Sequence, residues 1–192
     1  DRLPEGTTAR SVSLADKLDS LAGLFGVGEV PTGEKDPFAL RRAALGVIRI
    51  VVEGDLDLSL ADLVGDAFAG FRGKIGDAQA DLQGFILERM RGYLQERGSS
   101  SHEVDAVLAL NPVRLRLIPH QLEAVRAFAK LPDAANLAAA NKRIGNILKK
   151  SGPVSTTLDA SRLVEPEEKA LHAAVAAAAS KAEPCFAAGD YA

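Results

Sequence analysis

Residues 14–28 read Leu-Ala-Asp-Lys-Leu-Asp-Ser-Leu-Ala-Gly-Leu-Phe-Gly-Val-Gly, and residues 35–50 read Lys-Asp-Pro-Phe-Ala-Leu-Arg-Arg-Ala-Ala-Leu-Gly-Val-Ile-Arg-Ile. In the first segment the large apolar side chains recur at three- and four-residue steps, the spacing of one helical face, at Leu14, Leu18, Leu21 and Phe25. The glycines Gly26 and Gly28 follow directly and are expected to end this helix.

The second segment predicts another helix after a loop. Asp36 is a suitable N-cap, and Pro37 suits the first helical position, where its missing N–H costs nothing. Apolar residues then continue at helical spacing until Gly54. Together the two segments predict a helix, a glycine-rich bend and a second helix.

The composition is that of a helical globular protein. The chain has 192 residues, 47% of them hydrophobic and 26% charged, and it contains no Trp. This length suits one domain or two small ones. No apolar run reaches the roughly 20 residues needed to span a bilayer. The lone Cys185 cannot form an internal disulfide, which is compatible with a cytoplasmic protein. Because the chain starts at Asp1 without an initiator Met, we expect it to be a piece of a longer protein.

The remaining segments predict an all-α fold. Helical periodicity and capping residues predict eight helices, near residues 8–25, 37–54, 59–71, 77–97, 100–110, 122–128, 134–150 and 165–184. Pro184 is expected to break the last of them. The Asn111-Pro112 break is the expected domain boundary.

Several motifs come close to catalytic or metal sites without completing them. Residues 28–35, Gly-Glu-Val-Pro-Thr-Gly-Glu-Lys, miss the phosphate-binding loop pattern because Glu34 separates the second glycine from Lys35. The histidines (His102, His120 and His172) lack ligand spacing, and Cys185 has no nearby His, so neither a metal site nor a catalytic nucleophile is expected.

The segment 134–150 is the candidate binding element. At 100° per residue its apolar side chains gather on one side, at Leu137, Ala140, Ile144, Ile147 and Leu148. The other side carries polar and basic residues, namely Lys142, Arg143, Asn146, Lys149 and Lys150. Residues 101–150 hold 8 Lys or Arg against 4 Asp or Glu, although the whole chain has a net charge of −3. This pattern fits an RNA-binding face, and it fits a solvated basic face about equally well.

Two further charged groups have open interpretations. Arg41 and Arg42 could contact tRNA backbone or a partner subunit, but we favour a buried ion pair that holds helices together, for instance with Asp16 or Asp19. Residues 15–18, Ala-Asp-Lys-Leu, resemble the last motif of the HD-type metal phosphohydrolases, in which the Asp completes a metal site. The first histidine, His102, comes well after that motif, so this chain is not expected to assemble such a site.

Residues 14–50, above all the stretch 35–42, closely resemble the beta subunits of bacterial heterotetrameric glycyl-tRNA synthetases, and later segments at 141–148 and 163–168 match as well. The resemblance implies three parts. Residues 1–28 would end an HD-like domain, residues 29–111 would form a helical middle region, and residues 112–192 would begin a truncated, DALR-like anticodon-binding domain.

The resemblance also implies a function. The chain would be a tRNA-binding, non-catalytic portion of a cytoplasmic glycine–tRNA ligase with two alpha and two beta chains, without membrane or DNA contacts. With this resemblance, RNA contact is favoured over a solvated face for the basic side of 134–150, and the expected tRNA-binding residues are Lys142, Arg143, Asn146, Lys149 and Lys150. The alpha subunit would hold ATP and Mg and catalyse glycylation of tRNA(Gly), so no cofactor is expected here. Two alternatives are a piece of an HD-type metal phosphohydrolase and a helical protein–protein scaffold that does not bind RNA.

Overall fold

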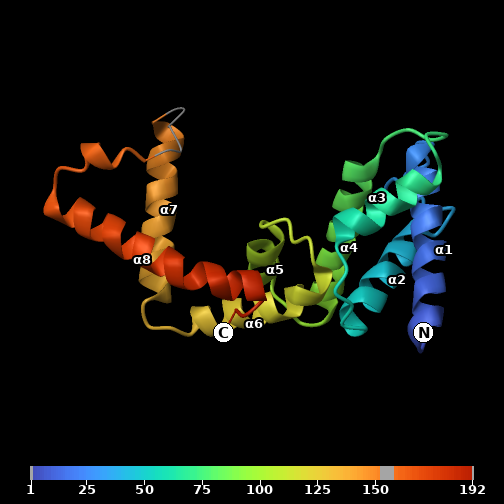
Figure 1. The fold of residues 1–192 in the computed structure, drawn as a ribbon, viewed down its shortest axis with the longest axis horizontal. Helices are drawn as coiled ribbons and strands as arrows, with labels where there is room; N and C mark the ends of the chain where they lie inside the picture. Colours follow the sequence, from blue (N-terminus) through green and yellow to red (C-terminus); the bar gives the residue numbers. More distant parts are fainter. Residues whose placement is uncertain (1, 152–157, 192) are drawn as a thin grey trace. The chain divides into compact units, whose positions relative to one another are not determined.

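The computed structural model describes residues 2–151 and 158–191, and within these residues the fold is all-α, as predicted (Figure 1). No strand occurs in this part of the chain beyond an isolated bridge between Thr32 and Lys35. The helices are α1 (Thr7–Gly26), α2 (Leu40–Glu53), α3 (Leu60–Gly70), α4 (Gln79–Glu96), α5 (Ser101–Leu108), α6 (Ile118–Ala129), α7 (Ala134–Lys150) and α8 (Pro166–Ala188). Two 3₁₀ turns, η1 (Leu115–Leu117) and η2 (Ala160–Arg162), lie between them.

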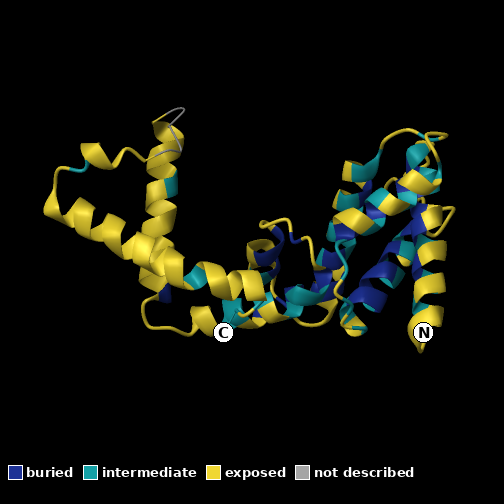
Figure 2. Ribbon diagram, in the orientation of Figure 1, coloured by how far each residue is buried: buried dark blue, intermediate teal, exposed yellow. Residues whose placement is uncertain are grey.

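The chain divides into two compact units, Asp1–Val125 and Arg126–Ala192, and α6 runs across the division. The first unit holds nearly all of the hydrophobic core (Figure 2). Helix α1 packs against α2, α3 and α4, and α2 also contacts α4 and η1. The largest completely buried side chains come from all of these elements and include Leu21, Ile48, Val64, Ile86 and Leu115.

Two glycines of α1 let neighbouring elements approach closely. Gly26 is the last residue of the helix, and its carbonyl accepts a hydrogen bond from the Gly76 N–H at 2.8 Å. A Cβ at residue 26 would lie only 2.5–2.8 Å from side-chain atoms of Ile75, and a Cβ at Gly23 would lie 2.9 Å from Phe71. The end of α1 is therefore set by packing as well as by helix termination.

The start of α2 differs from the prediction. The helix begins at Leu40 rather than at Pro37, because Ala39 adopts a left-handed conformation with φ of 55°. Asp36 still acts as a cap, since its carboxylate accepts hydrogen bonds from the N–H groups of Leu40 and Arg41 at 2.8 and 3.0 Å. The Arg41 guanidinium donates a hydrogen bond to the Gly33 carbonyl. The loop before α2 is therefore held by the Asp36 carboxylate and by the Arg41 side chain.

Residues 112–125, which follow the predicted Asn111-Pro112 break, belong to the first unit. Asn111 is a true bend, with φ of 47°. After it, the Val113 carbonyl accepts a hydrogen bond from the Leu60 N–H at 2.8 Å, and Leu115 and Ile118 are buried. The predicted division of the chain at residues 28 and 111 into family domains stays a prediction.

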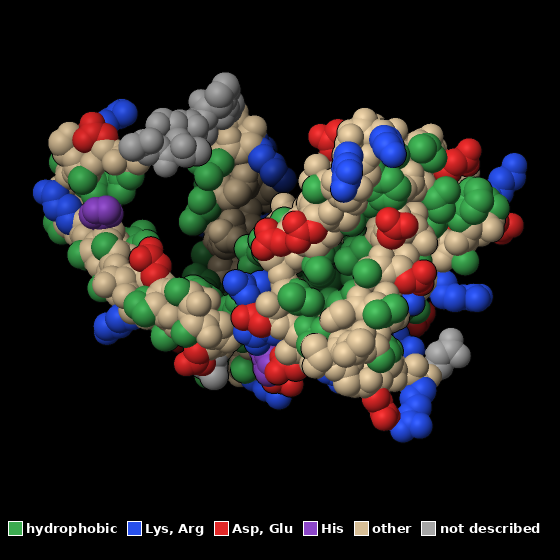
Figure 3. All heavy atoms as spheres, turned by 45° about the vertical axis from the view of Figure 1, so that its right-hand side comes forward, with side chains coloured by type: hydrophobic (Ala, Val, Ile, Leu, Met, Phe, Trp, Pro, Cys, Tyr) green, Lys and Arg blue, Asp and Glu red, His purple; other side chains and the backbone are tan. Residues whose placement is uncertain are grey.

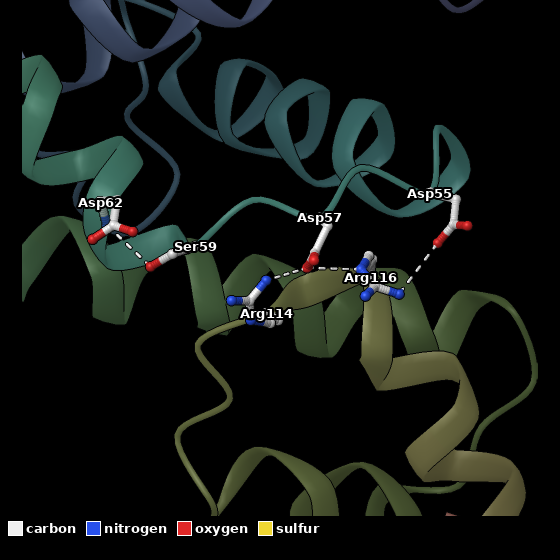
Figure 4. A network of polar contacts seen from close by, with 6 residues as sticks. All are labelled: Asp55, Asp57, Ser59, Asp62, Arg114 and Arg116. Atoms are coloured by element: carbon white, nitrogen blue, oxygen red, sulfur yellow. Dashed lines mark hydrogen bonds and ion pairs between the residues drawn. The ribbon is translucent and has the colours of Figure 1, made fainter. Parts of the chain in front are cut away.

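A group of ion pairs holds the same segment in place (Figure 4). The Asp57 carboxylate lies between Arg114 and Arg116 and accepts hydrogen bonds from both, with an Nε–O distance of 2.9 Å to Arg116. The hydrogen bonds from Arg116 and then Arg114 lower the pKa of Asp57. Arg116 also lies 3.8 Å from Asp55. These residues, called here the Asp57 clasp, join the α2–α3 connection to η1.

The second unit has almost no interior. Among its described residues only Ala134 is buried. Figure 3 shows hydrophobic side chains on its outside, between charged ones. Helix α8 begins close to residue 165, as predicted, with a capping box between Glu165 and Glu168 and with Pro166 in its first turn. The expected break at Pro184 was wrong, because α8 continues to Ala188. Helix α8 is exposed around Pro184, so water can satisfy the carbonyl that loses its partner there.

Candidate nucleic-acid interface

Helix α7 forms because most of its residues are the strong helix formers Ala, Leu, Lys and Arg, and because it contains no Pro and no β-branched run. Asp133 occupies the N-cap position, but its side chain makes no capping hydrogen bond. At the other end, the Ser151 N–H and hydroxyl both donate to the Ile147 carbonyl, at 3.1 and 3.0 Å. Lys149 and Lys150 lie in the last turn, where positive charge favours the helix dipole.

The five predicted site residues all lie on α7, and all are exposed. We call them the α7 basic face: Lys142, Arg143, Asn146, Lys149 and Lys150. At 100° per residue they span an arc of about 120° on one side of the helix. Four of the five line a shallow hollow of about 410 Å³ together with Ala139 and Ile147, and Lys149 lies outside it.

The positive charge of this face is not neutralised within the described residues. No ion pair in this part of the chain involves Lys142, Arg143, Lys149 or Lys150, and no Asp or Glu lines the hollow. Four adjacent cations can neutralise phosphates, and the Arg143 guanidinium can bind one phosphate through two hydrogen bonds. The Asn146 amide can both donate to and accept from a base edge.

The opposite side of α7 is apolar and also exposed. Its large side chains retain about half of their accessible surface, with exposed fractions of 59% for Leu137, 55% for Ile144, 54% for Ile147 and 47% for Leu148. A helix with one basic and one apolar face can bind RNA and pack against protein at the same time. The solvated-face interpretation of the basic residues therefore stays open on geometry alone.

The structure does not place Arg41 and Arg42 in the expected buried ion pair. Arg41 donates to the Gly33 carbonyl instead of pairing with Asp16 or Asp19, and Arg42 is exposed. The preferred buried ion pair was therefore wrong. The near-miss to a phosphate loop is a tight turn, in which the Thr32 and Lys35 backbones bond to each other.

One polar cluster was missed by the sequence reasoning. Glu53, at the end of α2, accepts hydrogen bonds from Arg49 (2.9 Å), Arg97 (2.7 Å) and the Tyr93 hydroxyl (3.2 Å). The Arg49 hydrogen bond is the main cause of a lowered Glu53 pKa, and burial raises the pKa of Tyr93 to about 12. The Arg49–Glu53 pair could have been found from its i,i+4 spacing. Tyr93 of α4 and Arg97, the residue after α4, could not be found in this way, since they are 40 or more positions from Glu53 in the sequence.

Sites of other kinds are not found in the described residues. No three His, Cys, Asp or Glu side chains in residues 2–151 and 158–191 are placed to hold a metal ion. Within the same ranges, no helix combines the length and the apolar character needed to cross a membrane. Asp16 of the HD-like motif is exposed on α1.

Comparison with known proteins gives one consistent result. A family model described as glycyl-tRNA synthetase beta subunit matches residues 1–109. The beta subunit of glycine–tRNA ligase from Thiobacillus denitrificans is 55% identical over the whole of this chain, and those from Delftia acidovorans and Paracidovorax citrulli are each 54% identical. The chain spans only 27–28% of the length of these relatives.

Proposed function

The chain belongs to the family of glycyl-tRNA synthetase beta subunits, and on this basis we propose that it is a tRNA-binding, non-catalytic part of a glycine–tRNA ligase. The observation that supports the RNA-binding role is the α7 basic face, with its four cations unpaired among the described residues. Glycine activation, with its ATP and Mg, takes place on the alpha subunit. The beta chain holds tRNA(Gly) for that subunit in a cytoplasmic complex of two alpha and two beta chains.

The mechanism that we propose is electrostatic positioning. Lys142, Arg143, Lys149 and Lys150 neutralise successive phosphates, and this releases counterions from the RNA. The Asn146 amide adds a contact that can distinguish bases. Four phosphate contacts give a slope of about −3 in a plot of log affinity against log salt concentration, so a fourfold rise in salt weakens binding roughly 60-fold.

The test is a titration of tRNA(Gly) into this chain and into the full-length beta subunit, with the double variant Lys142→Glu and Arg143→Glu. The variant is expected to bind at least tenfold more weakly, with a salt slope shallower by about 1.5. The matched control is Arg72→Glu with Lys74→Glu, which makes the same charge change at two exposed residues of the α3–α4 connection. The control variant is expected to bind like the unaltered chain.

Two results would count against the proposal. Equal tRNA affinity of the Lys142→Glu, Arg143→Glu variant and the unaltered chain would remove the α7 basic face from the binding site. A tRNA affinity that does not depend on salt, or no measurable tRNA affinity, would favour the alternative of a protein–protein scaffold. In that case the exposed apolar side of α7 would be the surface that binds protein.

A further inference from the structure

A second surface, in the first unit, has the opposite electrostatic character. A groove of about 720 Å³ runs between α1 and α3. Its floor is apolar and includes the buried Leu14 and Leu18 of α1 and the partly buried Leu63 and Ala67 of α3. A neighbouring hollow continues the surface along α1 to Val12, whose side chain is 65% exposed.

The rim of this groove is acidic. Asp16 and Asp19 of α1 and Asp66 of α3 line it, all three are exposed, and no Lys or Arg is among the lining residues. Within the described residues no ion pair involves these carboxylates. Lys17 lies between Asp16 and Leu18 in the sequence, but its side chain turns toward α2. A Cβ added at Gly46 of α2 would lie 2.5 Å from the Lys17 Cε.

The charge of the groove determines which partner it fits. Three carboxylates around an apolar floor repel the phosphates of RNA, so this surface is unsuited to tRNA. They attract an amphipathic helix that places apolar residues on the floor and Lys or Arg beside the rim. We propose that the α1–α3 groove is a docking site for a basic amphipathic helix of the alpha subunit. This inference rests on the proposed function, because that function requires an alpha subunit.

The assignment divides two tasks between the units of the chain. The α7 basic face, in the second unit, contacts RNA, while the acidic groove in the first unit contacts protein. The opposite charges also keep each partner from the other's site, because like charges across an interface weaken the incorrect complex.

The first experiment measures the affinity of the full-length beta subunit for the alpha subunit after Asp16→Lys with Asp66→Lys, one change on each side of the groove. Replacing two rim attractions by two repulsions is expected to raise the Kd at least about tenfold. The matched control, Glu34→Lys with Glu96→Lys, reverses two exposed acids outside the groove and is expected to leave the Kd unchanged. Circular dichroism checks that both variants are folded, and the neutral pair Asp16→Asn with Asp66→Asn is expected to have an intermediate effect.

The second experiment identifies the occupant directly. A photo-crosslinking residue at Ala67 in the assembled enzyme is expected to form an adduct with an alpha-subunit peptide that carries Lys or Arg beside apolar residues at helical spacing. Absence of an alpha-subunit adduct, including the case in which all adducts fall on beta-chain peptides, would overturn the inference, as would an unchanged Kd of the Asp16→Lys, Asp66→Lys variant. If the unaltered beta subunit does not bind the alpha subunit at all, the proposed function itself fails.

Discussion

Replacement of Gly26 by Ala tests whether packing fixes the end of α1. The new Cβ would lie 2.5 Å from Cδ1, 2.7 Å from Cβ and 2.8 Å from Cγ1 of Ile75. A change of rotamer cannot remove the contact with the Ile75 Cβ, so the backbone must move. The hydrogen bond from the Gly76 N–H to the Gly26 carbonyl opposes that movement.

The expected effect is a loss of stability. Overpacking of this kind costs about 1–3 kcal/mol. The better helix propensity of Ala returns less than about 1 kcal/mol, because Gly26 is the last residue of the helix. We therefore expect the free energy of unfolding to fall by about 1–2 kcal/mol, measured by urea unfolding with circular dichroism at 222 nm.

Two variants make this measurement specific. Gly84→Ala, inside α4 with no atom within 4 Å of the added Cβ, is expected to raise stability by about 0.5–1 kcal/mol. Ile75→Ala removes two of the three contacting atoms, so it should lessen the effect of Gly26→Ala in a double-mutant cycle. A Gly26→Ala variant as stable as the unaltered chain would refute the packing argument.

Three further predictions concern other parts of the molecule. Glu53→Gln should destabilise the chain at neutral pH. Because the folded pKa of Glu53 is lowered from 4.5, its contribution is complete above pH 4.5 and is lost as the pH falls through the lowered value, so the two unfolding free energies should converge in acid. Ile48→Ala should cost about 2–5 kcal/mol in urea unfolding, whereas Ile144→Ala on the exposed side of α7 should change stability by less than about 0.5 kcal/mol; a similar loss for both would contradict the near-absence of a core in the second unit. Ser100→Ala removes the capping box of α5 and should cost about 1 kcal/mol by thermal unfolding; an unchanged Tm would contradict that role.

Local signals in the sequence predicted most helices well. Ser59 accepts a hydrogen bond from the Asp62 N–H at the start of α3, and Ser100 forms a capping box with Glu103 at the start of α5. These features depend on residues three positions apart, so they are visible in the sequence. The start of α2 was harder to predict from the sequence. The left-handed conformation of Ala39 depends on how the preceding loop closes through the hydrogen bond from Arg41 to Gly33.

Long-range features could not be predicted from the sequence. In the Asp57 clasp, Asp57 is separated in the sequence by 57 positions from Arg114 and by 59 positions from Arg116. The acidic groove needs Asp66 of α3 beside Asp16 and Asp19 of α1. Helical spacing did predict the shared face of the α7 site residues, because one helix carries them all. Their contact with RNA stays a prediction.

The Asp57 clasp has a practical consequence for dissecting this protein. The family model ends at residue 109, which suggests a convenient place to truncate the polypeptide. A version shortened there would lose both arginines of the clasp and would leave a hole where Leu115 and Ile118 fill the interior. A shortened version intended for crystallisation or spectroscopy should therefore extend at least to Val125.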